Sequence, residues 1–227
     1  MQPKEPQLGP LTKKYFEEVT RGYVPEASIK FKSSWWFNRL AAIILKPFNP
    51  TFLQKFITTY RSTIWVPDDF ESMEDLQALE VVIHETQHIR DHKKLGTFLW
   101  YLVYGSPQIL AFLALGAIFA ILNTWFLLFL LFLLFLLPLP SPGRYWAELR
   151  AYKTLGITRK ILNNYDDQSL QIINNWIVGL LSGKLYYFCF PFEKKIMEDL
   201  SSNSVEKDNI YQETIEFLEK NKLNPKE

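Results

Sequence analysis

Hydrophobic and polar residues change their pattern sharply along this chain, and one apolar stretch stands out. Between Leu95 and Gly143 there is no charged residue, and from Trp125 to Leu137 every side chain is apolar. A helix of a soluble core would carry a polar face at helical spacing, and this stretch has none. Its length and composition predict a membrane segment.

Two breaks divide the apolar stretch. Gly105-Ser106-Pro107 interrupts its first part and Asn123-Thr124 divides the rest, which leaves the runs 107–122 and 124–139 of sixteen residues each. As an α-helix, each run would be about 24 Å long, somewhat less than a hydrocarbon core of about 30 Å. We therefore expect an apolar helical hairpin over residues 97–140 that is either spanning or re-entrant.

Basic residues flank the predicted hairpin on both sides. They are Arg90, Lys93 and Lys94 before it and Arg144, Arg150 and Lys153 after it. Because positive charge concentrates on the cytoplasmic side of membrane segments, both ends of the hairpin are predicted to face the cytoplasm. The aromatic residues that suit the membrane interface are Trp100, Tyr101 and Tyr104. These features predict an integral membrane protein with both termini in the cytoplasm.

The segment before the hairpin has the pattern of a long helix over residues 73–94. Ser72 can cap its N-terminus, with Asp75 as the capping partner three residues later. Acidic residues stand in the first turn and basic residues in the last, as the helix dipole favours. Gly96 can close the C-terminus. This is the most strongly marked helix outside the apolar stretch.

The remaining elements are shorter. Thr58–Val66 is rich in β-branched and aromatic residues and predicts one or two strands. Trp35–Leu45 predicts an amphipathic helix that either packs on the core or lies on a membrane surface, and the pattern alone does not decide between these. The fold class is therefore mainly α with a small β element.

One motif on the helix 73–94 carries chemistry, namely His84-Glu85-Thr86-Gln87-His88. Residues four apart share a helix face, so the two imidazoles can each direct a nitrogen to one zinc ion. Zinc lowers the pKa of a bound water to about 7. Glu85 can accept the proton of that water without binding the metal. The alternative hypothesis is an ordinary helix surface that carries two histidines.

A catalytic zinc site needs a third protein ligand. His92 is excluded, because ligands at His84, His88 and His92 would spread over about 12 Å of helix axis. Asp91 lies three residues after His88 on nearly the same face. It suits orienting that histidine, or a plain surface role.

Glu148 is the better candidate for the third ligand. The helix 73–94 stops just before the hairpin, and Glu148 comes just after it. Because the two arms are equal in length, an antiparallel hairpin would return the chain to the point where it left, near His84 and His88. The alternative is a surface glutamate paired with Arg144, four residues earlier.

Composition narrows the range of functions. The net charge is +1 over 227 residues, so nothing indicates a nucleic-acid partner. Cys189 is the single cysteine, which excludes an intramolecular disulfide and argues against a cysteine metal cluster. A reducing compartment is consistent with this.

Taken together, the His-Glu-x-x-His helix, the apolar hairpin and the segment with Glu148 resemble the gluzincin metallopeptidases. The likeness is greatest to their membrane-embedded heat-shock and CAAX-prenyl-protease branch, and it covers about Thr58–Tyr152. The resemblance implies a minimal gluzincin-like core that the membrane hairpin interrupts. It also implies zinc (Zn2+) held by His84, His88 and Glu148, with Glu85 as the general base.

The resemblance implies a place for the substrate as well. A strand near Thr63-Ile64-Trp65 would pair with an extended peptide. Gluzincins often place an aspartate four residues after the glutamate ligand to support it, and Tyr152 stands at that position here. The residue that stabilises the transition state in the family has no motif in this chain, and its candidates by residue type are Tyr152, Tyr186 and Tyr187.

The predicted function is that of a membrane-anchored zinc metallopeptidase that hydrolyses peptide bonds at the cytoplasmic membrane face. Its partners would be a polypeptide substrate and the lipid bilayer. One alternative is a membrane-anchored structural or assembly protein with an inactive or structural zinc site, whose fourth ligand would come from Cys189 or Asp91. Another is a protein that perturbs membranes by inserting its hairpin.

These predictions divide the chain into five segments. They are a polar N-terminal arm (1–30), the N-terminal part of a catalytic domain (31–96), the membrane hairpin (97–140), the C-terminal part of the catalytic domain (141–192) and a charged helical tail (193–227).

Overall fold

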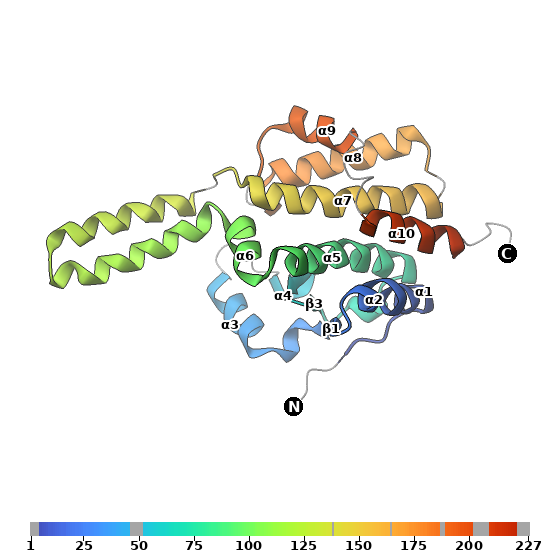
Figure 1. Cartoon of the computed structure of the whole chain (residues 1–227), viewed down its shortest axis with the longest axis horizontal. Helices are drawn as coiled ribbons and strands as arrows, with labels where there is room; N and C mark the ends of the chain where they lie inside the picture. The colour runs from blue at the N-terminus through green and yellow to red at the C-terminus, as the bar shows by residue number, and fades with distance from the viewer. Residues whose placement is uncertain are drawn as a thin grey trace. The chain divides into compact units, whose positions relative to one another are not determined.

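The computed structural model describes residues 5–45, 52–137, 139–163, 165–186, 189–201 and 209–221. Most of them are helical (Figure 1). One small sheet has three strands. The expected fold class, mainly α with a small β element, is confirmed at this level. The chain forms two compact units: unit 1 comprises Met1–Lys94, Ile157–Asn164 and Glu206–Glu227, and unit 2 comprises Leu95–Gly156 and Tyr165–Val205.

The sheet of unit 1 consists of β1 (Ser28–Phe31), β2 (Thr58–Tyr60) and β3 (Thr63–Val66). β3 lies in the centre, parallel to β1 and antiparallel to β2. The two strands predicted within Thr58–Val66 are confirmed. β1 was not predicted, and most of it lies in the segment that was expected to be a polar arm. Its four residues are too few to establish a periodic pattern.

The long helix α5 (Asp75–Leu95) corresponds to the helix predicted over residues 73–94. The predicted cap is wrong. Ser72 belongs to a preceding 3-10 turn, where its hydroxyl donates to the carbonyl of Asp69 at 2.6 Å. Gly96 has φ 77° and ends α5 as predicted, because glycine accepts this left-handed conformation without strain.

Asp75 serves a different helix from the one predicted. Its carboxylate accepts hydrogen bonds from the backbone N–H groups of Leu11 and Thr12, at 2.8 and 3.0 Å, in the first turn of α1 (Pro10–Tyr15). The first N–H groups of a helix have no partner within the helix, so this carboxylate satisfies two of them. The start of α1 is thereby attached to the start of α5.

The N-terminal segment contributes to the core of unit 1. After α1 come a π-helical turn (Phe16–Thr20) and α2 (Arg21–Tyr23). The buried apolar cluster that joins this segment to the sheet and α5 includes Tyr15, Phe16, Val19, Ile29, Ile64, Val66, Leu79, Val82 and Ile83. This segment was expected to be a polar arm because most of its residues are polar. Its few aromatic and aliphatic side chains are nevertheless buried, and aromatic side chains bury large areas.

Polar contacts hold the side of α5 that faces away from His84. Thr86 shares a hydrogen bond of 2.8 Å with the hydroxyl of Thr20. Arg90 is 1% exposed and pairs with Glu213 on α10 (Asn209–Lys220). At about 100° per residue, Thr86 and Arg90 lie roughly opposite His84 on the helix. The face of α5 opposite His84 is therefore held by polar contacts to other parts of unit 1.

The helix α3 (Trp36–Leu45) exposes the apolar side chains of Trp36, Phe37, Leu40 and Ile43. Trp36 and Ile43 are 68% and 71% exposed, so the hypothesis that this face packs on the core is wrong. Trp35, just before the helix, stacks on Trp65 of β3 with ring centroids 4.8 Å apart. The alternative, a helix on a membrane surface, stays a prediction. A short helix, α4 (Phe52–Lys55), comes before the sheet strand β2.

Unit 2 contains α6 (Thr97–Gly105), the hairpin, the first part of α7 (Pro142–Asn163), α8 (Asp167–Ser182) and α9 (Glu193–Ser201). The last turns of α7 belong to unit 1. The buried cluster that joins α7, α8 and α9 includes Tyr145, Tyr152, Leu155, Ile177, Leu181, Cys189 and Ile196. The base of α7, where Glu148 lies, is therefore packed in the core of unit 2.

The hairpin consists of two 3-10 helices, η4 (Gln108–Ile121) and η5 (Thr124–Leu136), where α-helices were expected. The sequence of η5 repeats one phenylalanine and two leucines, which matches the three residues per turn of a 3-10 helix. The phenylalanines that form one column, with successive ring centroids 5.9, 5.8 and 6.0 Å apart, are Phe126, Phe129, Phe132 and Phe135. A rise of about 2.0 Å per residue makes η4 about 28 Å long, longer than an α-helix of the same residues.

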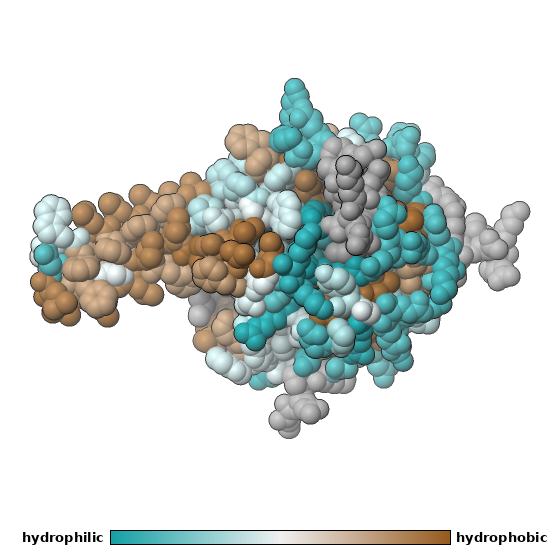
Figure 2. Space-filling model, in the orientation of Figure 1, coloured by the Kyte–Doolittle hydropathy of each residue, from teal (hydrophilic) through white to brown (hydrophobic). Residues whose placement is uncertain are grey.

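The two arms pack through this phenylalanine column. The residues of η4 with the same spacing of three are Ala111, Ala114, Ala117 and Ala120. A Cβ added at Gly116 would lie 2.4 Å from the ring of Phe129, so the arms approach closely there. The leucines between the phenylalanines are exposed, and Figure 2 shows hydrophobic residues over most of the visible hairpin surface.

Among the described residues, no single helix is both long and apolar enough to cross a membrane. The helices α6 and η4 reach that length and composition only together, and they meet at an angle of 96°.

Candidate metal centre

His84 and His88 lie on one face of α5, one turn apart, as their spacing predicts. Their Nε2 atoms are 3.2 Å apart, and the two rings are nearly perpendicular, at 82°. Two nitrogens bound to one tetrahedral zinc ion at about 2.0–2.1 Å would be about 3.3 Å apart. The imidazoles are therefore already at the separation that one zinc ion requires.

Glu85, the next residue along α5, is buried and oriented by the sheet. Its side chain is 8% exposed. Thr59, on β2, donates a hydrogen bond from its hydroxyl to Glu85 Oε2 at 2.6 Å. This bond engages one carboxylate oxygen and holds the group beside the edge of the sheet.

Lys32 adds a buried positive charge near Glu85. It lies in the 3-10 turn (Lys32–Ser34) that follows β1 and is 0% exposed. Burial lowers the pKa of its ammonium group to about 8, and the nearby charge of Glu85 opposes part of this shift. Neither Lys32 nor Thr59 belongs to a sequence motif. Lys32 follows β1 and Thr59 lies on β2, so their proximity to Glu85 depends on the tertiary structure and could not be predicted from the sequence.

Glu148 is buried in the first half of α7, with 2% of its surface exposed. Tyr104, in the last turn of α6, donates its hydroxyl hydrogen to Glu148 Oε1 at 2.6 Å. The alternative of a glutamate on the helix surface is therefore wrong. The guanidinium of Arg144, the surface partner considered for it, lies 5.4 Å from the centre of the Tyr104 ring.

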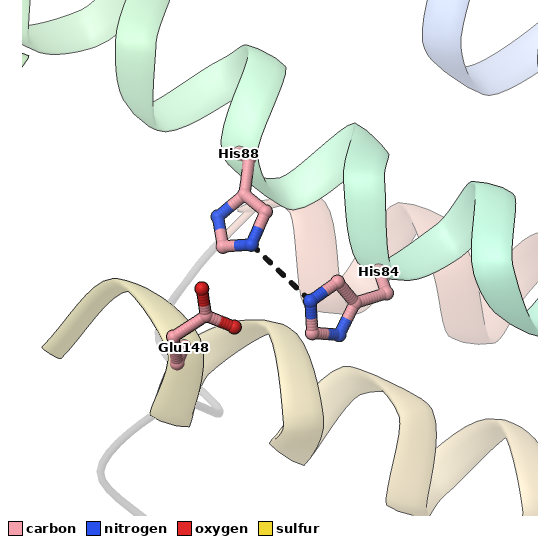
Figure 3. Close-up of side chains that lie close together, drawn as sticks. All are labelled: His84, His88 and Glu148. Carbon is pink, nitrogen blue, oxygen red and sulfur yellow. Dashed lines mark hydrogen bonds between the residues drawn. The ribbon is translucent and has the colours of Figure 1, made fainter. Parts of the chain in front are cut away.

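Within the part of the chain that the structure describes, one group of side chains could hold a metal ion. It consists of His84, His88 and Glu148, whose ligand atoms all lie within 4.8 Å of one another (Figure 3). Two of these side chains come from α5 and one from α7. Two imidazoles and one carboxylate also form the ligand set of a well-known class of catalytic zinc sites, which keep a fourth position open.

The other polar residues of α5 are not members of this group. Asp91 is 1% exposed, so its predicted surface role is wrong, and it accepts a hydrogen bond from Gln87 Nε2 at 3.1 Å. A role of Asp91 in orienting His88 stays a prediction. His92 lies outside the group that could hold a metal ion, in agreement with its exclusion on geometry. Burial lowers the pKa of His92, and the charge of Arg61 lowers it further.

The tyrosines considered for the transition state lie in unit 2. The hydroxyls of Tyr152 and Tyr186 share a hydrogen bond of 2.6 Å. Burial raises the pKa of Tyr186 well above its ordinary value, and the charge of Glu148 adds to the rise. Tyr186 is therefore a neutral hydroxyl at neutral pH, which can donate or accept a hydrogen bond. Tyr187 lies outside the described residues.

Cys189 is a free, buried cysteine. It is 1% exposed, and its Sγ–H donates to the carbonyl of Leu181 at 3.5 Å. Burial raises the pKa of Cys189 to about 12, and the thiolate is the form that binds metals. Cys189 is not in the group of described side chains that could hold a metal ion, so the structure gives no support to it as a fourth ligand.

The strand predicted to bind substrate is not available for pairing. Thr63, Ile64 and Trp65 belong to β3, which is paired with β1 on one edge and with β2 on the other. That prediction is wrong, because it assumed an edge strand and did not include β1. In the three-stranded sheet the outer strand nearest the motif is β2, since its Thr59 bonds to Glu85.

Comparisons with protein-family models, with curated proteins and with solved structures gave no match for this chain. What it does must therefore be inferred from its own residues.

Proposed function

We propose that this chain is a zinc-dependent metallopeptidase. The observation that carries the proposal is the 3.2 Å separation of the His84 and His88 Nε2 atoms on a helix that also carries Glu85 between them. Two ligands at this distance suit tetrahedral zinc, and a carboxylate beside the first ligand suits a general base.

In the proposed reaction, Glu85 transfers the proton, and the water and the peptide carbonyl are activated by zinc. Zinc, when bound, would acidify a water molecule and polarise the carbonyl of the scissile peptide bond. Glu85 accepts the proton of the attacking water and passes it to the leaving amine. The hydroxyl of Thr59 holds one oxygen of that carboxylate, which leaves the other to take the proton.

Glu148 is proposed as the third ligand. It lies eleven residues, or about three turns, before Arg159 on α7, so both lie on one face of that helix. Arg159 makes a bidentate contact with Glu80 on α5, at 2.9 and 2.8 Å. Glu80 lies one turn before His84, on the same face of α5. The face of α7 that carries Glu148 is thus the one that contacts α5 in unit 1, which supports the assignment.

An extended peptide is proposed to pair with β2. Its inner edge is occupied by β3, and among the described residues no strand pairs with its outer edge. A peptide that extends a sheet gains main-chain hydrogen bonds regardless of its sequence. The scissile bond would then lie close to Glu85, because Thr59 connects that strand to the carboxylate.

We also propose that the hairpin embeds in lipid with both flanks at the cytoplasmic face. Its outward leucines leave a large apolar surface, and exposed patches of this kind mark contacts with protein or membrane. The phenylalanines pack against one another inside the hairpin. The leucines on its outer side are exposed, and lipid would give them an apolar environment. Of the basic residues at its two ends, Arg90 and Lys153 are buried, whereas the exposed Lys93 and Lys94 and the half-buried Arg144 and Arg150 suit anionic headgroups.

The hairpin proposal can be tested with liposomes. Leu128 and Leu131 are 53% and 61% exposed and point away from the phenylalanine column. Replacing both by aspartate should lower membrane partitioning by about 100-fold per site, since an aspartate at a helix centre costs about 2.5–3.5 kcal/mol. Flotation of reconstituted protein measures this. The matched double alanine variant should float like the wild type, and an aspartate variant that floats equally well would contradict the proposal.

The peptidase proposal is tested by metal removal. Protein purified gently in detergent should contain one zinc per chain and cleave unstructured fluorogenic peptides. A zinc chelator should abolish the cleavage, and added zinc should restore it, because the reaction needs the metal to acidify water. Zinc without cleavage would favour a structural or assembly role. A wild type without zinc would refute the proposal, and chelator-insensitive liposome leakage would favour a membrane-perturbing protein.

A further inference from the structure

The hydrogen bond between Tyr104 and Glu148 connects the hairpin region to the candidate metal centre. Both residues belong to unit 2. The Tyr104 hydroxyl donates to Glu148 Oε1 at 2.6 Å, and Glu148 is 2% exposed. A hydrogen bond to an ionised carboxylate is among the stronger ones in proteins, especially when it is shielded from water. The bond therefore restricts how the carboxylate can rotate.

The ring of Tyr104 is itself held in place. The Trp100 ring, which is buried, lies 5.3 Å from it, one turn earlier on α6. The Arg144 guanidinium lies 5.4 Å from its centre and comes from the start of α7. Aromatic packing and a cation above the ring each favour one ring orientation. The direction of the hydroxyl is thus set by contacts other than its bond to Glu148.

The base of the hairpin fixes α6 and α7 together. Ser141, just before α7, donates from its backbone N–H to the carbonyl of Cys189 at 2.7 Å, and its hydroxyl donates to the carbonyl of Ser106. Gly143 lies so close to α6 that an added Cβ would be 2.1 Å from the carbonyl oxygen of Val103. No side chain fits there, so the two helices are in direct backbone contact beside Tyr104.

We propose that Tyr104 is the positioning residue for Glu148, and that through it the base of the hairpin sets the geometry of the metal centre. This inference rests on the proposed function, in which Glu148 binds zinc. Because Tyr104 holds Oε1, it would limit the directions from which the carboxylate could bind a zinc ion. Partners of this kind change metal affinity by about 10–100-fold. Tyr152 stands where gluzincins have a supporting aspartate, and its hydroxyl shares a hydrogen bond with Tyr186.

The test is Tyr104→Phe in the full chain, which removes the hydroxyl and keeps the ring. Zinc affinity, measured by competition with a chelating dye, should fall about 10–100-fold. The visible spectrum of the cobalt-loaded protein should change, because a carboxylate that rotates alters the ligand field. Tyr145→Phe is the matched control, since the Tyr145 hydroxyl donates to Asp199 at 2.8 Å in the same unit. That control should keep the zinc affinity and the cobalt spectrum of the wild type.

A double-mutant cycle separates positioning from general stability. In a Glu148→Ala background, Tyr104→Phe should have no further effect on zinc affinity, because its target is gone. An equal loss in both backgrounds, or a loss that Tyr145→Phe reproduces, would overturn the inference. A Tyr104→Phe protein that binds zinc like the wild type would also overturn the inference, but it would not contradict the peptidase proposal. A wild type that binds no zinc overturns both.

Discussion

Replacing Glu85 by glutamine is expected to abolish peptide cleavage while zinc remains bound. Glutamine has the shape of glutamate, and its side-chain oxygen can still accept the hydrogen bond of Thr59. It cannot take a proton from the attacking water at neutral pH. General acid–base catalysis contributes about 10²–10⁴-fold, so we expect kcat to fall about 1000-fold with little change in KM. Steady-state cleavage of an unstructured peptide and metal analysis of the same sample measure both quantities.

The control for this variant is Glu219→Gln, the same chemical change at an exposed residue of α10. It should leave zinc content and cleavage unchanged. If Glu85→Gln cleaved peptides at the wild-type rate, Glu85 would not be the base. If it lost zinc together with activity, Glu85 would support the metal centre itself, and a structural role of the site would gain weight.

Replacing His88 by glutamine is expected to remove zinc. His88 is 6% exposed, and glutamine approximates its volume, so the packing of α5 should change little. Apparent zinc-binding free energies of about 10–16 kcal/mol are shared among three or four ligands. The loss of one imidazole should therefore weaken zinc binding by about 1000-fold. Titration with a chelating dye, together with the loss of peptide cleavage, measures the effect.

His92→Gln provides the matched control on the same helix. His92 lies one turn beyond His88 and outside the metal-binding group. Its substitution should change zinc affinity by less than about twofold, because it removes no proposed zinc ligand. Equal zinc loss in both variants would mean that the histidines act through the stability of α5. Wild-type zinc affinity in His88→Gln would refute the ligand assignment.

Local spacing along one helix was enough to predict two of the three residues that could hold a metal ion. His84 and His88 share a face because they are four residues apart, and the helical repeat decides this without any tertiary contact. The exclusion of His92 follows from the same repeat. The strands within Thr58–Val66 could also be predicted, because a short run rich in β-branched and aromatic residues that ends at a proline is a local strand signal.

Two errors arose where a residue had partners far away in the sequence, and a third, in the hairpin, had a local cause. Asp75 has the spacing of a capping partner for α5, yet it caps α1, 64 residues away. Thr63, Ile64 and Trp65 were expected to pair with a peptide substrate, but the unpredicted β1 pairs with them. In the hairpin, the expected α-helices are 3-10 helices, because the period-three phenylalanines align only with three residues per turn.

The sequence by itself determined that two imidazoles and one carboxylate occupy neighbouring positions on a helix, and that an apolar hairpin follows it. Only the tertiary structure decided that Thr59 bonds to Glu85 and Tyr104 to Glu148, and that Glu148 belongs to a group able to hold a metal ion. The physical reason is range. Helical spacing acts over three or four residues, whereas these contacts join residues 26 and 44 positions apart, which pairing and packing alone bring together.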